Sequence, residues 1–464
     1  MQSQLKTGLK RELNLLDATT LVIGSMIGSG IFIAPSLMAN YIQTPGLIIL
    51  LWLVGGILTI FGSLSYAELA AAMPRSGGQY VFLKEAYSPL IAFLYGWTLF
   101  LVIQSGFIAA VAVAFAKYLG VFIPSLSETN IIFTLGSFSL NTAQIVAILS
   151  IILLTFVNIL GVKLGAVVQN VFTILKISAI LALIVFSFLF SNGSVKNFSP
   201  IFTPIVPEAL GISFFAALAV AMSKALFAYD AWNSVTFAAE EIKKPDVNLP
   251  RALILGTTTT ALIYTLVTMA YIYVVPIDKM AIVPDNRIAA EVSYIVLGNA
   301  GLIFITIAIL ISTFGCNNGL ILAGPRVYYA MANDQLFFKK AQMVHPKFQT
   351  PSVSLWYQCL WACLLTLTGT YSDLLTYTAF ASLLFNLLTV VGLFILRKKL
   401  KDLPRPYKTT GYPLTPILYI LVALFFIIYI FIGDIRNSGF GLLIILTGIP
   451  VYIFMKKKIV DNNG

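Results

Sequence analysis

Apolar stretches of about 20 residues recur along the whole chain, and they constrain the fold more than any other feature, because that length crosses a bilayer as a helix. Hydrophobic residues make up 59% of the chain and charged residues only 10%, against roughly 25% charged residues in soluble domains. We therefore expect an all-α integral membrane protein with 12 transmembrane helices, numbered here as spans 1 to 12. The stretches lie near residues 15–38, 46–72, 89–116, 143–162, 165–190, 210–238, 252–275, 301–332, 353–371, 374–396, 413–433 and 439–455.

Basic residues are divided unevenly between the two sets of loops. With the N-terminus inside, the cytoplasmic loops and both termini hold most of the 29 Lys and Arg residues. The opposite loops hold only Lys117, Lys196, Lys279, Arg287 and Arg436. By the positive-inside rule, both termini are expected in the cytoplasm of a multi-pass plasma-membrane protein, such as one of a bacterial inner membrane. The net charge of +11 is then a topology signal, and we expect no binding to nucleic acid because the chain has no soluble basic domain.

Residues suited to metal binding or catalysis are scarce. The three cysteines, Cys316, Cys359 and Cys363, fall in spans 8 and 9, where small apolar packing residues are the simplest interpretation. His345 is the single histidine and falls in a cytoplasmic loop. No carboxylates are paired with a recognisable nucleophile. We therefore expect no metal, no cofactor and no enzymatic activity.

Span 1 contains the run GSMIGSGIF at residues 24–32, where three glycines weaken a helix at membrane depth. One interpretation is close helix packing, because Gly24 and Gly28 have G-x-x-x-G spacing. The other is a broken helix, whose unpaired backbone groups are tolerated in a membrane only where they line a cavity or bind something. A half-helix that begins near Ser29 would direct N–H groups at an anion, and one that ends near Met26 would direct carbonyls at a cation.

Span 6 contains a second interruption, at Asp230 and Asn233 within residues 225–233. Such polar residues at membrane depth usually face a bundle interior or a water-filled site. Spans 1 and 6 open two halves of five spans, and the second half enters the membrane from the opposite side. Paired broken helices at corresponding positions are typical of transporters with inverted repeats.

Four segments together carry a family resemblance: GSMIGSGIF (24–32), SYAELAAAMPRSGGQYVFLKEAY (65–87), VVQNVFTILKISAI (167–180) and FAYDAWNSVTFAAEEIKKPDVNLPRA (227–252). In this order they resemble the amino acid–polyamine–organocation (APC) superfamily, and within it bacterial relatives of the L-type amino acid transporter (LAT) branch. The resemblance implies a LeuT-like fold, in which two inverted five-helix repeats with broken helices 1 and 6 form the core and two helices lie outside it.

The implied divisions follow the predicted spans. We expect a cytoplasmic N-terminal segment, a transport core of two repeats, two peripheral helices and a cytoplasmic tail. Their ranges are 1–14 for the segment, 15–396 for the core (repeats about 15–190 and 210–396), 413–455 for the peripheral helices and 456–464 for the tail.

The resemblance also implies a binding site for the backbone of a free amino acid. The substrate carboxylate would meet the N–H groups of Gly28, Ser29 and Gly30. Its ammonium would meet the carbonyls of Met26, Phe227 and Asp230, with the Phe227 ring as a gate. The Asp230 carboxylate is expected to cap N–H groups of the second half-helix, although contact with a cationic substrate is the alternative. Asn233 either locks the break or contacts the substrate side chain.

Four further residues are implied in coupling and gating. Lys176, deep in span 5, takes the place of a sodium ion in sodium-coupled relatives, with carbonyls near Gly24 and the hydroxyl of Ser312 or Thr313 around its ammonium. The alternative is that Lys176 binds the coupled proton. Tyr264 matches a tyrosine that helps to close span 1 from the inside.

The leading interpretation is a sodium-independent exchanger of small neutral L-amino acids that works by alternating access. Its rivals are a proton-coupled symporter, a cationic amino acid or polyamine exchanger, and a membrane sensor. Lys224, one turn before Phe227, departs from the family pattern. It either faces the outer vestibule, where it disfavours cationic substrates, or snorkels or pairs within the bundle. Animal members of the LAT branch bind a heavy subunit through a cysteine after span 3. The loop 117–142 has none, so we expect no such partner beyond the substrate and the lipid bilayer.

Overall fold

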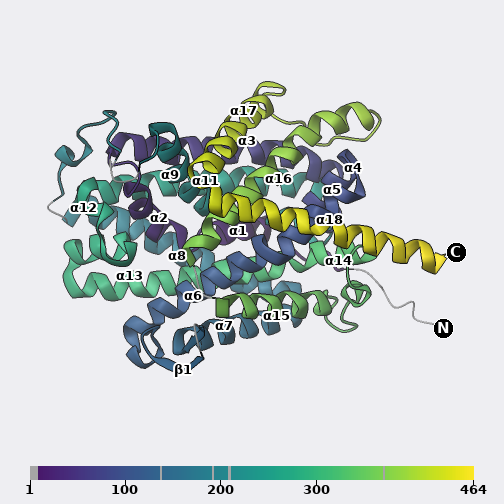
Figure 1. Ribbon diagram of the computed structural model, residues 1–464, viewed down its shortest axis with the longest axis horizontal. Helices are drawn as coiled ribbons and strands as arrows, with labels where there is room; N and C mark the ends of the chain where they lie inside the picture. The colour runs from purple at the N-terminus through teal and green to yellow at the C-terminus, as the bar shows by residue number, and fades with distance from the viewer. Residues whose placement is uncertain (1–8, 136–137, 191–192, 207–210, 369–370, 464) are drawn as a thin grey trace.

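The computed structural model describes residues 9–135, 138–190, 193–206, 211–368 and 371–463. Residues 1–8 and 464, which belong to the predicted cytoplasmic N-terminal segment and tail, lie outside the described residues. Long helices lie side by side and run along the longest axis of the molecule (Figure 1). The predicted class, an all-α membrane protein, is confirmed.

The first half of the chain contains spans 1 to 5. Span 3 is interrupted by a π-helical turn, Leu99–Ile103, a feature that is frequent near functional sites. The α-helices and strands of this half are α1 (Leu15–Met26), α2 (Gly30–Ala39), α3 (Pro45–Ala72), α4 (Gln79–Ala86), α5 (Pro89–Thr98), α6 (Gln104–Phe122), β1 (Ile131–Leu135), β2 (Phe138–Asn141), α7 (Thr142–Ile159) and α8 (Val162–Phe190).

The second half contains spans 6 to 12. Its helices are α9 (Phe214–Tyr229), α10 (Ser234–Phe237), α11 (Pro245–Val274), α12 (Ile277–Ala281), α13 (Ile288–Ala323), α14 (Pro325–Asn333), α15 (Ser352–Thr368), α16 (Tyr371–Lys399), α17 (Leu414–Gly433) and α18 (Ile435–Asn463).

Ten helical segments in the described chain are long and apolar enough to cross a membrane. Two shorter apolar helices, Phe214–Tyr229 and Ser352–Leu367, correspond to the predicted spans 6 and 9. Span 6 is short because its helix breaks inside the bundle. The total of twelve membrane crossings therefore stays a prediction, because it requires that these two shorter helices also cross the membrane.

Contacts between helices recur at an interval of five spans. Span 1 meets span 6 where α2 packs on α9, span 2 meets span 7 (α3 on α11), span 3 meets span 8 (α6 on α13) and span 4 meets span 9 (α7 on α15). The contact of α1 with α8 is likewise matched by that of α9 with α16. Such matched pairs are the pattern that two repeats related by a two-fold axis produce. The last two helices, α17 and α18, have the most exposed windows of the ten long segments, as expected for peripheral helices.

One short antiparallel hairpin interrupts the helical pattern. Strands β1 and β2 pair within the connection between spans 3 and 4, with Phe133 opposite Leu140 and Thr134 opposite Ser139. The pattern of apolar spans did not predict this element and left the whole of residues 117–142 as a loop. The hairpin ends at Asn141, whose side chain accepts from the N–H of Gln144 and starts α7.

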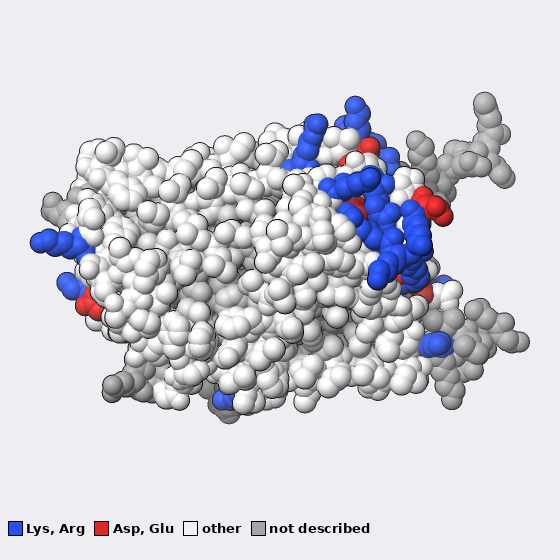
Figure 2. All heavy atoms as spheres, turned by 90° about the horizontal axis from the view of Figure 1, so that it is seen from above, with Lys and Arg blue, Asp and Glu red and all other residues white. Residues whose placement is uncertain are grey.

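Exposed basic side chains gather at one end of the molecule. In Figure 2 most Lys and Arg atoms lie at the end where α18 finishes in Figure 1, and the long middle section is almost free of charge. An uncharged belt between charged ends is the surface expected of a protein that crosses a bilayer.

Candidate functional site

Span 1 breaks inside its glycine-rich run. As predicted, α1 ends at Met26 and α2 begins beside Ser29, at Gly30. The N–H of Ile27 donates to Ile23 O (2.9 Å) and closes α1, and the N–H of Gly28 donates back to Met26 O (2.9 Å). The carbonyl end of one helix and the N–H end of another therefore meet within three residues. One of the three N–H groups predicted for a substrate carboxylate, that of Gly28, is engaged inside the break in this conformation.

Span 6 breaks without a glycine. Helix α9 ends at Tyr229, and the one-turn helix α10 starts at Ser234. Between them Ala231 has φ 67°, a left-handed conformation that costs a non-glycine residue energy and is usually found where the surrounding structure enforces it. One carboxylate oxygen of Asp230, Oδ1, accepts from the N–H of Ala231 (2.7 Å). This N–H belongs to the break and lies before α10 begins, so the predicted cap of Asp230 on the second half-helix is not formed in this conformation.

The two breaks are packed against each other. A Cβ atom added to Gly30 would lie only 2.8 Å from the Cβ of Ala228, so the N-terminal end of α2 touches the last turn of α9. The hydroxyl of Tyr264, on α11, donates to Met26 O (2.8 Å) and Ala228 O (3.0 Å). One side chain, Tyr264, thus satisfies a carbonyl at the end of α1 and another near the end of α9. The predicted contact of Tyr264 with span 1 is present.

Lys176 of α8 is fully buried against the span 1 break. Its Nζ donates to Gly24 O (3.0 Å), Ile27 O (2.7 Å) and Ser312 O (2.9 Å), so three carbonyls match the three N–H donors of an ammonium. A buried cation is tolerated only when its donors are satisfied in this way. The ammonium therefore cross-links spans 1, 5 and 8.

The predicted hydroxyl partners of Lys176 are wrong in detail. Span 8 presents the backbone carbonyl of Ser312, and the Ser312 hydroxyl instead donates to Ile27 O (3.1 Å) and Gly28 O (3.2 Å). The hydroxyl of Thr313 donates to Ile309 O (2.7 Å), one turn back in its own helix. A hydroxyl in a helix often satisfies itself in this way, which leaves Thr313 outside the lysine site.

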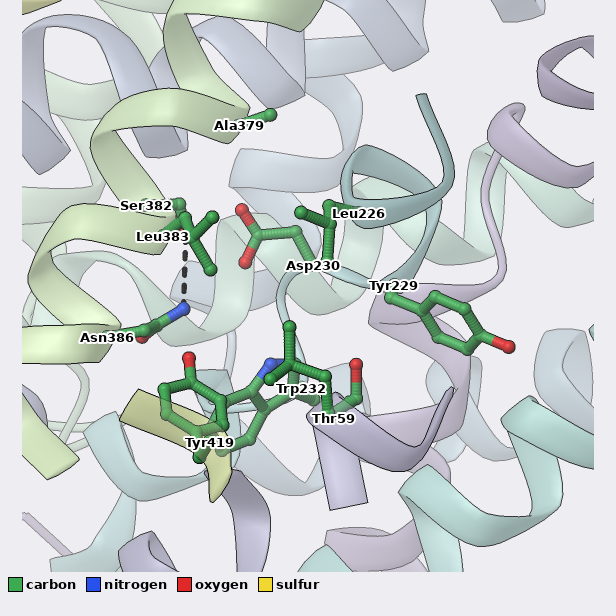
Figure 3. Close-up of a pocket in the computed structure, with 11 residues that line it drawn as sticks. Thr59, Leu226, Tyr229, Asp230, Trp232, Ala379, Ser382, Leu383, Asn386 and Tyr419 are labelled. Atoms are coloured by element: carbon green, nitrogen blue, oxygen red, sulfur yellow. Dashed lines mark hydrogen bonds between the residues drawn. The ribbon is translucent and has the colours of Figure 1, made fainter. Parts of the chain in front are cut away.

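Two cavities lie beside the span 6 break and share Asp230 and Ser382. The first, called the span 11 cavity, is drawn in Figure 3. It is lined by Leu58, Thr59, Leu226, Tyr229, Asp230, Trp232, Ala379, Ser382, Leu383, Asn386 and Tyr419. The second, called the span 3 cavity, is lined by Gln79, Tyr95, Leu99, Ile103, Gln104, Phe107, Asp230, Ala231, Asn233, Ser234, Phe237 and Ser382.

Only some of the predicted substrate residues border these cavities. Asp230 and Asn233 do, whereas Met26, Gly28, Ser29, Gly30 and Phe227 line neither of the two. The Phe227 ring instead stacks on Phe107 at a centroid distance of 4.6 Å, and Phe107 lines the span 3 cavity. In this conformation the span 1 break is covered by packed side chains.

A buried polar network beside the break was missed by sequence reasoning. Asn233 Nδ2 donates to Gln79 Oε1 (2.6 Å), Gln79 Nε2 donates to Thr389 Oγ1 (3.0 Å), and Tyr66 OH donates to Asn386 Oδ1 (2.7 Å). The network ties the break to α4, α3 and α16, which favours a locking role for Asn233. The signal available in the sequence was Asn386, an amide in the middle of an apolar run.

Lys224 is buried in α9, with 7% of its surface exposed. This position favours an interaction inside the bundle over snorkelling to the membrane surface.

The amino acid permease family matches residues 13–455. The chain belongs to this family. Among its relatives, the serine/threonine exchanger SteT of Bacillus subtilis (strain 168) is 34% identical over 453 residues, which cover 97% of this chain and 98% of the relative. The large neutral amino acids transporter small subunit 2 of Mus musculus is 32% identical over 96% of this chain and 81% of its own. The b(0,+)-type amino acid transporter 1 of Mus musculus is 30% identical, with coverage of 96% and 88%.

This membership confirms the APC resemblance and the LAT-like relatives. The chain is a multi-pass membrane permease for amino acids, and its family and relatives are transporters, not enzymes.

Proposed function

We propose that the protein exchanges small neutral L-amino acids across the membrane, without sodium, by alternating access. One observation carries the proposal: the two helix breaks meet inside the bundle, where α2 packs on α9 and Tyr264 bridges their neighbouring carbonyls. Opposed broken helices offer N–H groups and carbonyls at one place, which suits a zwitterion. The predicted transport core, residues 15–396, would move as two repeats about this site.

The amino acid backbone would replace contacts that the breaks now make with themselves. Its carboxylate would accept from the N–H groups of Gly28, Ser29 and Gly30, and its ammonium would donate to the carbonyls of Met26, Phe227 and Asp230. The bond from Gly28 N–H to Met26 O joins a donor and an acceptor from these two sets. Its breakage on binding would leave both groups for the substrate, so little polar surface is left unpaired in either state.

Lys176 supports independence from sodium. Its ammonium already occupies the carbonyls of spans 1 and 8, so a fixed charge stands where a sodium ion would have to bind. In this role Lys176 is a structural cation, and Ser312 assists it by holding the Ile27 and Gly28 carbonyls.

The preference for small neutral side chains rests on the relatives and on charge. The serine/threonine exchanger from Bacillus subtilis matches nearly the whole chain. Lys224, buried one turn before Phe227, disfavours a second positive charge near the site.

The basic end of the molecule supports an orientation with both termini in the cytoplasm. The connection 117–142 has no cysteine for a disulfide, so we propose that the chain works in a bacterial inner membrane without a heavy subunit.

Purified protein in liposomes tests the proposal. Uptake of labelled alanine is measured in sodium-free buffer at equal pH on both sides, with liposomes that are empty or loaded with unlabelled alanine, serine or lysine. We expect loaded alanine or serine to stimulate uptake and lysine to have little effect. Accumulation in empty liposomes driven by an inward proton gradient would contradict exchange, and stimulation by lysine alone would contradict the neutral substrate class.

A further inference from the structure

Asp230 is the polar group at the breaks that the structure leaves half satisfied. Its side chain is buried, with 9% of the residue exposed. Oδ1 accepts from the N–H of Ala231, whereas Oδ2 has no hydrogen-bond partner in the described part of the chain. In Figure 3 the carboxylate points toward Ser382 and Leu383 of α16, into the span 11 cavity. An ionised carboxylate in such a place lacks both a counter-charge and a full set of donors.

The groups around Asp230 are polar but carry no positive charge. Neither cavity is lined by a Lys, Arg or His residue among the described residues. The titratable groups that line them are tyrosines: Tyr95 from span 3, Tyr229 from α9 itself and Tyr419 from α17. Span 2 contributes Thr59, α4 contributes Gln79, and α16 contributes Ser382 and Asn386.

Several of these groups also lack partners. The hydroxyls of Tyr95 and Ser234, which line the span 3 cavity, have no hydrogen-bond partner in the described part of the chain. Two unmatched hydroxyls in the cavity of a carboxylate that itself has an unmatched oxygen indicate a place where a proton or water completes the hydrogen bonding.

Lys176, in contrast to Asp230, has hydrogen-bond partners that match its charged form. Each of its three ammonium protons has a carbonyl acceptor, so loss of a proton would leave one of these carbonyls without a donor. Addition of a proton to Asp230 would instead create an O–H donor in a cavity that the hydroxyl groups of Ser382 and Tyr419 also line. The charged form of the lysine is matched atom by atom, and that of the aspartate is not.

We propose that Asp230 binds a proton while span 6 packs on span 10, and that this proton favours the packed conformation through which each exchange step passes. The inference rests on the proposed exchange of amino acids. When the two spans separate, water can solvate the ionised carboxylate and the proton leaves. At higher pH the packed conformation is therefore disfavoured, and exchange slows.

The test is alanine–alanine exchange in liposomes with the same pH inside and outside, so that no gradient drives uptake. We expect the wild-type rate to fall roughly fivefold or more between about pH 6 and about pH 9, as loss of one essential proton requires. Asp230→Asn, whose amide cannot ionise, should exchange at a rate that changes little with pH. The control is Asp278→Asn, an exposed carboxylate on α12, which should keep the wild-type profile.

A wild-type rate that does not change with pH overturns the proposal, as does an Asp230→Asn profile like that of wild type. If Asp230→Asn does not exchange at all, Ser382→Ala decides the matter. This variant removes a hydroxyl from the cavity that the carboxylate faces, so the pH of the decline should move, and an unmoved profile contradicts the proposal.

If sodium in place of potassium restores the exchange rate at high pH, a metal cation and not a proton binds at Asp230. That result also overturns the proposal. Absence of stimulation by internal alanine at every pH would instead be a failure of the exchange function itself.

Discussion

Single side chains satisfy the backbone groups that the broken helices leave open. The Lys176 ammonium donates to Gly24 O and Ile27 O, and the Tyr264 hydroxyl donates to Met26 O and Ala228 O. The Ser312 hydroxyl donates to Ile27 O and Gly28 O. An unpaired buried carbonyl costs about 1–3 kcal/mol, so each of these side chains stabilises one geometry of the break.

Tyr264→Phe removes one hydroxyl that serves two carbonyls. We expect exchange to fall about tenfold, because loss of about 1.4 kcal/mol corresponds to that factor. Exchange per reconstituted protein is the measurement. Tyr271→Phe, on the same helix, is the control, since its buried hydroxyl has no hydrogen-bond partner among the described residues and should be dispensable. Equal rates for the two variants would show that the bridge is unimportant.

Lys176→Met keeps an unbranched apolar stem of four atoms and removes the ammonium group. Three carbonyls lose a charged donor, each bond being worth roughly 1.5–3 kcal/mol, so exchange should fall by about 100-fold or more. Lys196→Met, in an exposed loop, should leave exchange unchanged. Wild-type exchange by Lys176→Met would refute the structural-cation role.

The limits of sequence reasoning are visible at these residues. The depth of Lys176 indicated a functional role, and the family resemblance implied its contact with span 1 carbonyls. The choice between the hydroxyl and the carbonyl of Ser312 depends on side-chain rotamers and helix rotation, which residue spacing does not determine. Thr313 was a candidate for the same reason, and its bond to Ile309 O could not be foreseen.

At the scale of elements, the two breaks are built by different means. In span 1 glycines allow the chain to separate into α1 and α2, and the half-helix ends near Met26 and Ser29 could be predicted. In span 6 the break contains Ala231 in a left-handed conformation, and the predicted stretch 210–238 gave no sign that α10 would be a single turn. The packing of Gln79 and Asn386 against this break joins segments far apart in sequence, so it appeared only in the structure.

Gly30→Ala tests the contact between the two breaks. The added Cβ would lie 2.8 Å from the Ala228 Cβ and 3.0 Å from its Cα, so α2 and α9 must move apart. Overpacking of this kind costs about 1–3 kcal/mol, and we expect the apparent affinity for alanine to fall about tenfold or more. Gly439→Ala, in α18 with no atom within 4 Å of the added Cβ, is the matched control. An affinity unchanged by Gly30→Ala would mean that the two breaks do not form one site.

At the scale of the whole molecule, helix contacts recur at an interval of five spans, and basic side chains gather at one end. The recurrence of apolar stretches was sufficient to anticipate the membrane-spanning class, whereas the orientation and the two repeats stay predictions. The hairpin between spans 3 and 4 was not anticipated, because strand pairing outside the membrane leaves no trace in the hydropathy of the spans.

Cysteine labelling in intact cells checks the orientation. In a variant whose three native cysteines are replaced by alanine, Lys243→Cys and Lys279→Cys place exposed thiols in the connections that precede and follow span 7. A membrane-impermeant maleimide should label the variant at position 279 and leave that at 243 unlabelled until the membrane is permeabilised. Labelling at position 243 but not at position 279 would show that the termini lie outside the cell, opposite to the predicted orientation.

The most direct measurement of the central claim, that the two breaks hold both ends of the amino acid backbone, uses liposomes loaded with alanine or with analogues that lack one charged group. Alaninamide has no carboxylate for the N–H groups of Gly28 to Gly30, and propionate has no ammonium for the carbonyls of Met26, Phe227 and Asp230. We predict that internal alanine stimulates uptake of labelled alanine and that neither analogue does. Stimulation by alaninamide or propionate equal to that by alanine would contradict the claim, because one helix end alone would then suffice for transport.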